Sequence, residues 1–117
     1  MSQGEPNAPQ AHTHGFEFNE WESWLETRTQ VLLQAGKHVE LRRGGEPTPK
    51  PCCSFRVKTD HALGQFDFWA TGEADYDVMD SVTRVFIYNV WGLDLSDTSF
   101  EATFENFLEL VIKHRGK

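Results

Sequence analysis

The chain has 117 residues and a formal net charge of −7, with 38% hydrophobic and 13% aromatic residues. This length fits one domain built around a single core. The negative charge argues against nucleic acids and anionic membranes as partners, because both attract a cationic surface. A basic protein partner fits the charge better.

Residues 1–15 contain Gly, Pro, Gln, Asn and His but almost no apolar side chains. Such a segment cannot repay its ordering entropy, so we expect a disordered tail followed by a single α+β domain over residues 16–117. His12 and His14 lie in this tail, and without further ligands nearby they are expected to be solvated. No apolar run approaches the ~20 residues of a membrane span and no secretory signal is recognisable, so the sequence predicts a cytoplasmic protein.

The domain is predicted to begin with a helix. Asn19 followed three residues later by Glu22 has the pattern of a capping box. Apolar residues then recur at helical spacing, which predicts a helix over Glu20–Ala35 with Trp21 and Trp24 in the core.

After this helix the apolar period changes to that of strands. Alternation predicts strands over His38–Arg43 and Cys52–Thr59, with a Gly-rich and Pro-rich loop between them. Cys52 and Cys53 are adjacent in the second strand, where successive side chains point to opposite faces. We therefore expect one buried and one outward thiol, with no disulfide between them.

The next two strands are predicted to form a hairpin from Gln65 to Val78 with its turn at Thr71-Gly72. One parity of the hairpin is apolar and is expected to face the core: Phe66, Phe68, Ala70, Ala74, Tyr76 and Val78. The other parity is acidic around one large aromatic residue: Asp67, Trp69, Glu73, Asp75 and Asp77.

A fifth strand is predicted over Thr83–Trp91. Its side chains are apolar on both parities, as in strands that are covered on both faces. The pattern therefore favours a central position in the sheet for this strand.

The domain is predicted to end with a helix from about Ser99 to His114. Thr98 and Glu101 form a second capping-box pattern at its start. The element order α-β-β-β-β-β-α with short links predicts an α+β fold, an antiparallel β-meander of four to six strands with the N- and C-terminal helices packed on one face. The other sheet face would then be available to a partner.

The sequence offers little enzymatic chemistry. Glu73, Asp75 and Asp77 share a strand face and could bind a divalent cation or act as paired acids, but three exposed acids of this kind are commonly just solvated. Asp60 and His61 are interpreted as turn residues. No known phosphate-binding or nucleophile motif is present. We therefore expect no catalytic residues, no cofactor and no metal site.

The acidic hairpin face is the candidate partner-binding site, formed by Asp67, Trp69, Glu73, Asp75 and Asp77. Like charges along one face are mildly destabilising, so the face is poorly optimised for stability alone. Tryptophan is the residue type most enriched at binding hot spots, which favours a docking surface. An ordinary solvated sheet face is the alternative.

The chain resembles the TriTu-type immunity proteins, and the resemblance covers roughly Glu20 to His114. It rests on scattered positions: Trp21, Trp24, Leu25, Arg28, Leu32 and Gly36, then Trp69-Ala-Thr-Gly72 leading into Asp75-Tyr-Asp77, and finally Phe104 and Leu108. The resemblance implies a non-catalytic inhibitor that binds its cognate antibacterial ADP-ribosyltransferase toxin in a one-to-one complex. It would block modification of elongation factor Tu by occluding the active site of the toxin.

Two other functions remain open from the residues alone. A small acidic secretion or effector chaperone would have a similar composition, and a strongly dimeric chain with large apolar patches would favour it. A small hydrolase or lyase that uses the acidic hairpin would need a pocket, for which the sequence gives no indication.

Overall fold

The computed structural model describes residues 17–43, 52–95 and 98–115. The predicted tail with His12 and His14, and the Gly-rich and Pro-rich loop after Arg43, lie outside the described residues. The helices and strands follow in the predicted order: α1 (Phe18–Gln34), β1 (His38–Arg43), β2 (Cys52–Lys58), β3 (Ala62–Trp69), β4 (Glu73–Asp80), β5 (Phe86–Asp94) and α2 (Phe100–Lys113).

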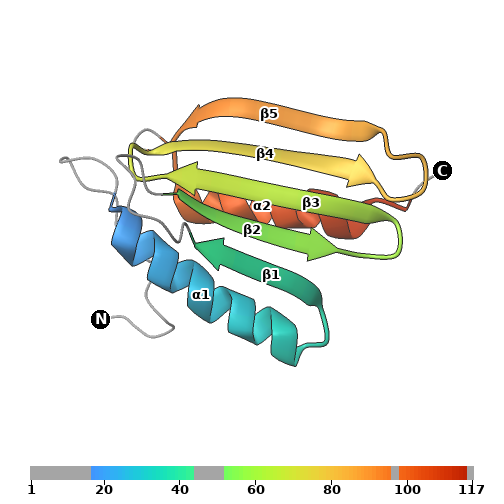
Figure 1. The fold of residues 1–117 in the computed structure, drawn as a ribbon, viewed down its shortest axis with the longest axis horizontal. Coiled ribbons are helices and arrows are strands. Elements are labelled where there is room, and N and C mark those ends of the chain that lie inside the picture. The colour runs from blue at the N-terminus through green and yellow to red at the C-terminus, as the bar shows by residue number, and fades with distance from the viewer. Residues whose placement is uncertain (1–16, 44–51, 96–97, 116–117) are drawn as a thin grey trace.

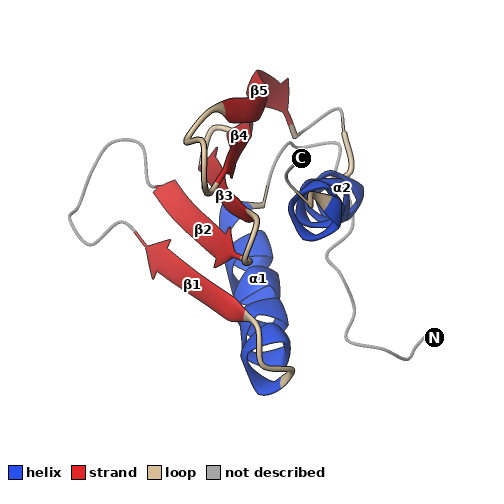
Figure 2. Ribbon diagram, turned by 90° about the vertical axis from the view of Figure 1, so that its right-hand side faces the viewer, coloured by secondary structure: helices blue, strands red, loops and turns tan. Residues whose placement is uncertain are grey.

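The five strands form one antiparallel sheet in the order β1-β2-β3-β4-β5, so every strand pairs with its neighbours in the chain (Figure 1). Both helices lie on the same side of this sheet, with α1 against β1 and α2 against the central strands, behind them in Figure 1 and to their right in Figure 2. The predicted α+β meander with both helices on one face is thereby confirmed. We call the sheet side without helices the open face.

The core lies between the sheet and the helices and is rich in aromatic rings. Trp21 of α1 stacks on Phe100 of α2 with ring centroids 4.6 Å apart. Phe66 of β3 packs against three rings of α2, those of Phe100, Phe104 and Phe107. Of the hairpin residues expected to face the core, Phe66, Phe68, Ala74, Tyr76 and Val78 are buried, whereas Ala70, in the turn after β3, is only half-buried. Helix α2 adds Phe104, Phe107 and Leu108 to the buried core. Cys53 is also buried and Cys52 is half-buried, with no disulfide between them, as predicted.

The starts of both helices differ from the predicted capping boxes. Helix α1 has Glu17 at its N-cap and no side-chain hydrogen bond there, so the Asn19 cap is wrong. Helix α2 is capped by Ser99, whose hydroxyl accepts a hydrogen bond from the Ala102 N–H. Ser and Thr are both good capping residues, so residue type alone could not decide whether Thr98 or Ser99 is the N-cap.

The predicted central position of the fifth strand is wrong. β5 pairs only with β4 and forms one edge of the sheet. Its register with β4 is interrupted between Ala74 and Tyr76 and again between Val78 and Met79, so side-chain parity along β5 is not a simple alternation. The strand is apolar on both faces because several of its apolar side chains are exposed, and not because both of its faces are buried.

Candidate functional site

The strand register brings the acidic residues of the hairpin together on the open face. Asp67 on β3 lies directly opposite Asp75 on β4, and Asp77 lies opposite Gln65. We call Asp67, Asp75 and Asp77 the acidic cluster. Two like charges directly across a strand pair are destabilising, so this arrangement does not serve the stability of the sheet.

Neutral donors hold the carboxylates of the acidic cluster. The Ser54 hydroxyl donates to Asp67 Oδ1 at 2.5 Å, and the amide nitrogen of Gln65 donates to both oxygens of Asp67 at 3.1 Å. Asp75 Oδ1 accepts a hydrogen bond from the backbone N–H of Gly92 at 2.9 Å. No ion pair among residues 17–43, 52–95 and 98–115 neutralises any of the three carboxylates. The cluster therefore presents its negative charge to solvent.

The environment of the cluster raises two pKa values. Partial burial raises the pKa of the Asp77 carboxyl, and the charges of Asp67 and Asp75 add to this effect. Partial burial also raises the pKa of the Cys52 thiol, with a further contribution from the charge of Asp67 that exceeds the opposing effect of Ser54. A catalytic cysteine needs a lowered pKa, so Cys52 has the opposite of the environment that would activate it.

The other two predicted site residues lie at the hairpin end of the same face. Trp69 is the last residue of β3, pairs with Cys52 in the register with β2, and is half-buried. Glu73 is the first residue of β4 and is exposed. Between them Gly72 takes a positive φ of 94°, which a non-glycine residue rarely adopts. The alternation of side chains along β3 and β4 thus puts the five predicted site residues on the open face. The acidic cluster lies in the middle of the two strands, and Trp69 lies at the hairpin end.

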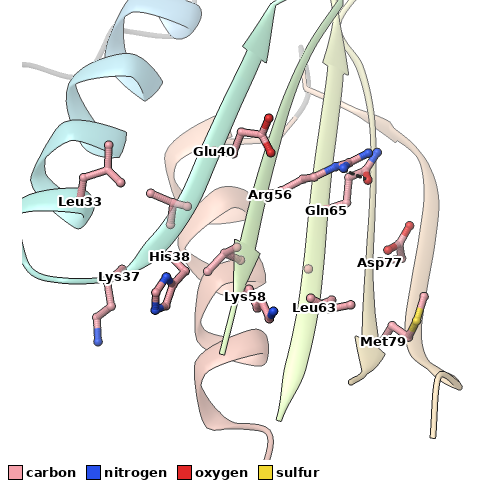
Figure 3. A pocket seen from close by; sticks show the side chains of 13 residues that line it. Leu33, Lys37, His38, Glu40, Arg56, Lys58, Leu63, Gln65, Asp77 and Met79 are labelled. Atoms are coloured by element: carbon pink, nitrogen blue, oxygen red, sulfur yellow. Dashed lines mark hydrogen bonds between the residues drawn. The ribbon is translucent and has the colours of Figure 1, made fainter. Parts of the chain in front are cut away.

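A basic half of the open face was not recognised as part of the site. His38 of β1 pairs with Lys58 of β2, and Arg56 donates a hydrogen bond to Gln65 Oε1 at 3.1 Å. Figure 3 shows Arg56, Gln65 and Asp77 side by side across three strands, so the basic half adjoins the acidic cluster. The outward parity of the second strand contained this signal, but only the strand order shows that the two halves adjoin.

A shallow hollow of about 550 Å³ lies over this boundary. Lys37, His38, Arg56 and Lys58 line one part of it together with one acidic residue, Glu40, and Asp77 lies at the other (Figure 3). The hollow carries charged groups of both signs. A surface of this kind is suited to a protein partner with a complementary charge pattern.

Asp80 and His114 form a His–Asp pair whose contacts hold the fold together. Asp80 accepts hydrogen bonds from the backbone N–H groups of Val82 and Thr83 and contacts His114 Nε2 at 2.8 Å. These contacts tie the end of α2 to the turn between β4 and β5. Within the described part of the chain, no group of three or more His, Cys, Asp or Glu residues is arranged to hold a metal ion.

The fold and the open face define a small α+β protein whose polar sheet face is suited to binding another protein. Neither helix in the described residues has the length and apolar character needed to cross a membrane. The family model for immunity protein TriTu matches residues 19–110, most of the chain, and the chain therefore belongs to the TriTu immunity protein family. No curated protein and no solved structure gives a significant match.

Proposed function

We propose that this immunity protein binds a cognate antibacterial ADP-ribosyltransferase toxin in the cytoplasm and neutralises it by occluding its active site. The modification of elongation factor Tu is then prevented without any reaction catalysed by the immunity protein. Family membership supports the immunity role.

The acidic cluster is the observation that carries the proposed binding mode. Its three carboxylates gather on a sheet face with no helix over it, at a cost in like-charge repulsion. A basic partner surface would relieve this repulsion on binding. The net charge of −7 would also speed association with such a partner, toward the order of 10⁸ M⁻¹s⁻¹ at low salt.

The described side chains favour occlusion over catalysis. The thiol nearest the cluster has a raised pKa, and the His114–Asp80 pair is engaged in holding a turn. A catalytic nucleophile would need a lowered pKa or a base held beside it. An inhibitor that covers a cleft needs neither.

The proposal is tested with a purified candidate toxin domain that ADP-ribosylates elongation factor Tu, together with NAD and elongation factor Tu. Titration of the immunity protein should abolish modification at a molar ratio near one-to-one, because each toxin molecule must be occupied. The immunity protein alone should not consume NAD. Rescue at a small fraction of the toxin concentration, increasing with time, would instead reveal an enzyme that reverses the modification.

A further inference from the structure

The outer edge of β5 is the most apolar exposed region in the described part of the chain. Seven large apolar side chains are exposed in the described part of the chain. Five of them lie on β5 or in the turn before it: Val82, Val85, Phe86, Tyr88 and Trp91. Trp91 is 72% exposed and Val85 is 61% exposed. Contiguous exposed apolar residues mark interaction sites on soluble proteins.

The two edges of the sheet differ in a way that points to use of β5. The β1 edge carries His38, Glu40 and Arg42, and charged side chains protect an edge strand against unwanted pairing. β5 has no charged residue from Phe86 to Leu93. It therefore lacks the protection that the opposite edge has.

We propose that β5 is a docking edge, to which a short, extended, basic segment of the partner toxin adds as a further strand. This inference rests on the proposed function and deepens it by naming the contact surface and the chemistry of its occupant. Backbone hydrogen bonds would supply affinity, and the apolar side chains of Phe86, Tyr88 and Trp91 would supply anchors.

The register of β5 fixes the length of the segment that it can take. Its pairing with β4 is regular through three consecutive residues, Tyr88, Asn89 and Val90, and is shifted on either side. Such irregularities bend an edge and shorten the stretch that can form a regular ladder. A short extended segment fits this edge better than a long strand.

The adjoining acidic cluster fixes the charge of the segment. Asp75 accepts a hydrogen bond from the Gly92 N–H of β5, so the cluster begins beside this strand. A segment added to β5 would lie two strand spacings, about 10 Å, from Asp75 and Asp77, a distance that long Lys and Arg side chains can bridge. A second copy of this chain would bring a further net charge of −7 and the same bent edge, and both oppose pairing between two β5 strands.

Hydrogen exchange tests the docking edge directly. The immunity protein is measured alone and in complex with the purified toxin domain that it inhibits. Amides of β5 between Phe86 and Leu93 should exchange at least about tenfold more slowly in the complex, while the amides of β1 keep their rates. Unchanged β5 exchange in a formed complex would overturn the inference.

Substitutions provide the second measurement. Tyr88→Lys should weaken toxin binding by at least about tenfold, because a lysine on an edge strand opposes pairing and repels a basic segment. Trp91→Ala should have a similar effect without a change of charge. Val31→Lys on α1 is the matched control, since it adds the same charge at an exposed apolar position of another element, and it should change the affinity less than about twofold. Thermal melting of each variant separates lost binding from lost folding.

The outcomes distinguish this inference from the proposed function. Failure of the wild-type chain to bind or inhibit the toxin would refute both. Inhibition that survives Tyr88→Lys and Trp91→Ala would overturn the docking edge and leave the proposed function intact. Sedimentation of the free chain as a dimer that Tyr88→Lys dissociates would also overturn it, because a second copy would then occupy the edge.

Discussion

Trp69 is half-buried, and its role follows from how much of its ring a partner can reach. It lies on the open face at the end of β3, but its ring is partly covered, whereas Trp91 on β5 is 72% exposed. A half-buried tryptophan can anchor a partner and also support its own sheet. Binding and folding must therefore be measured together for this residue.

We predict that Trp69→Ala costs about 2–4 kcal/mol of toxin binding, chiefly through faster dissociation, because a large aromatic anchor holds a formed complex. Surface plasmon resonance and thermal melting of the same variant provide the measurement. Unchanged binding kinetics would remove Trp69 from the interface. A large loss of melting temperature with normal binding of the folded fraction would assign it to the support of the sheet.

Asp80 links pH to the stability of the fold. Hydrogen bonds from the Thr83 N–H, from His114 and from the Val82 N–H hold the pKa of its carboxyl well below the usual value of about 3.9. Because the folded-state pKa is lowered, the stabilisation is present above the unfolded-state pKa. It is lost as the pH falls through the lower folded-state pKa.

We therefore predict that Asp80→Asn lowers the melting temperature at pH 5 to 7, and that the difference from the wild type shrinks below about pH 4. Thermal melting over this pH range checks the prediction. His114→Gln serves as a control: it keeps the two backbone hydrogen bonds to Asp80, so its acid dependence should be reduced but not abolished. If the melting temperatures of the wild type and Asp80→Asn differed by a constant amount down to about pH 2, the stabilisation would not come from the Asp80 carboxylate.

At the scale of the elements, Gly64 determines how closely α2 approaches the sheet. It lies on the core side of β3, and a Cβ atom placed there would clash with the Val111 side chain and lie 2.9 Å from Phe107 Cζ. Hydrogen is thus the only side chain that fits beneath this part of α2. The close approach lets the Phe-rich stripe of α2 reach the rings of β2, β3 and β4.

We predict that Gly64→Ala destabilises the fold by about 1–3 kcal/mol, because overpacking forces the helix or its side chains to move. Chemical denaturation measures the change. The double variant with Val111→Ala should lose less stability than the sum of the two single variants, because the smaller side chain at 111 relieves the clash. Strict additivity would show that Gly64 does not limit the helix–sheet distance.

The helices and the first four strands could be predicted from the sequence because their apolar periodicity corresponds to burial on one face. The hairpin is the clearest case: parity separated Phe66 and Tyr76 from Asp67 and Asp75, and the structure places these pairs on opposite faces. β5 could not be placed in this way. Its apolar residues do not report burial, and its two register shifts break the alternation on which parity depends.

At the scale of the whole molecule, the open face is electrically polarised. The β1–β2 side carries His38, Arg56 and Lys58 against one acidic residue, Glu40, and the β3–β4 side carries the acidic cluster. The outward residues of each strand were predictable singly. Their combination depends on strand order and register, which long-range packing determines, so the boundary between the halves and its hollow could not be derived from local patterns.

This polarity makes the position of a charge as important as its amount. The acidic half should steer a basic partner surface during approach, and short-range contacts should hold the complex afterwards. Charge changes within the acidic cluster should therefore act mainly on association. Charge changes of equal size elsewhere should have smaller effects.

We predict that Asp75→Lys with Asp77→Lys slows toxin association by about tenfold or more at low salt, with a smaller change in dissociation. The difference in association rate between this variant and the wild type should become smaller at high salt. At 1 M salt the screening length is only about 3 Å, so exposed charges no longer steer a distant partner. Glu20→Lys with Asp60→Lys is the control, with the same change in net charge at positions outside the acidic cluster. Stopped-flow association at several salt concentrations measures both pairs, and thermal melting verifies their folding. Equal slowing by the two pairs would mean that net charge alone steers the toxin, and the acidic cluster would lose its assigned role.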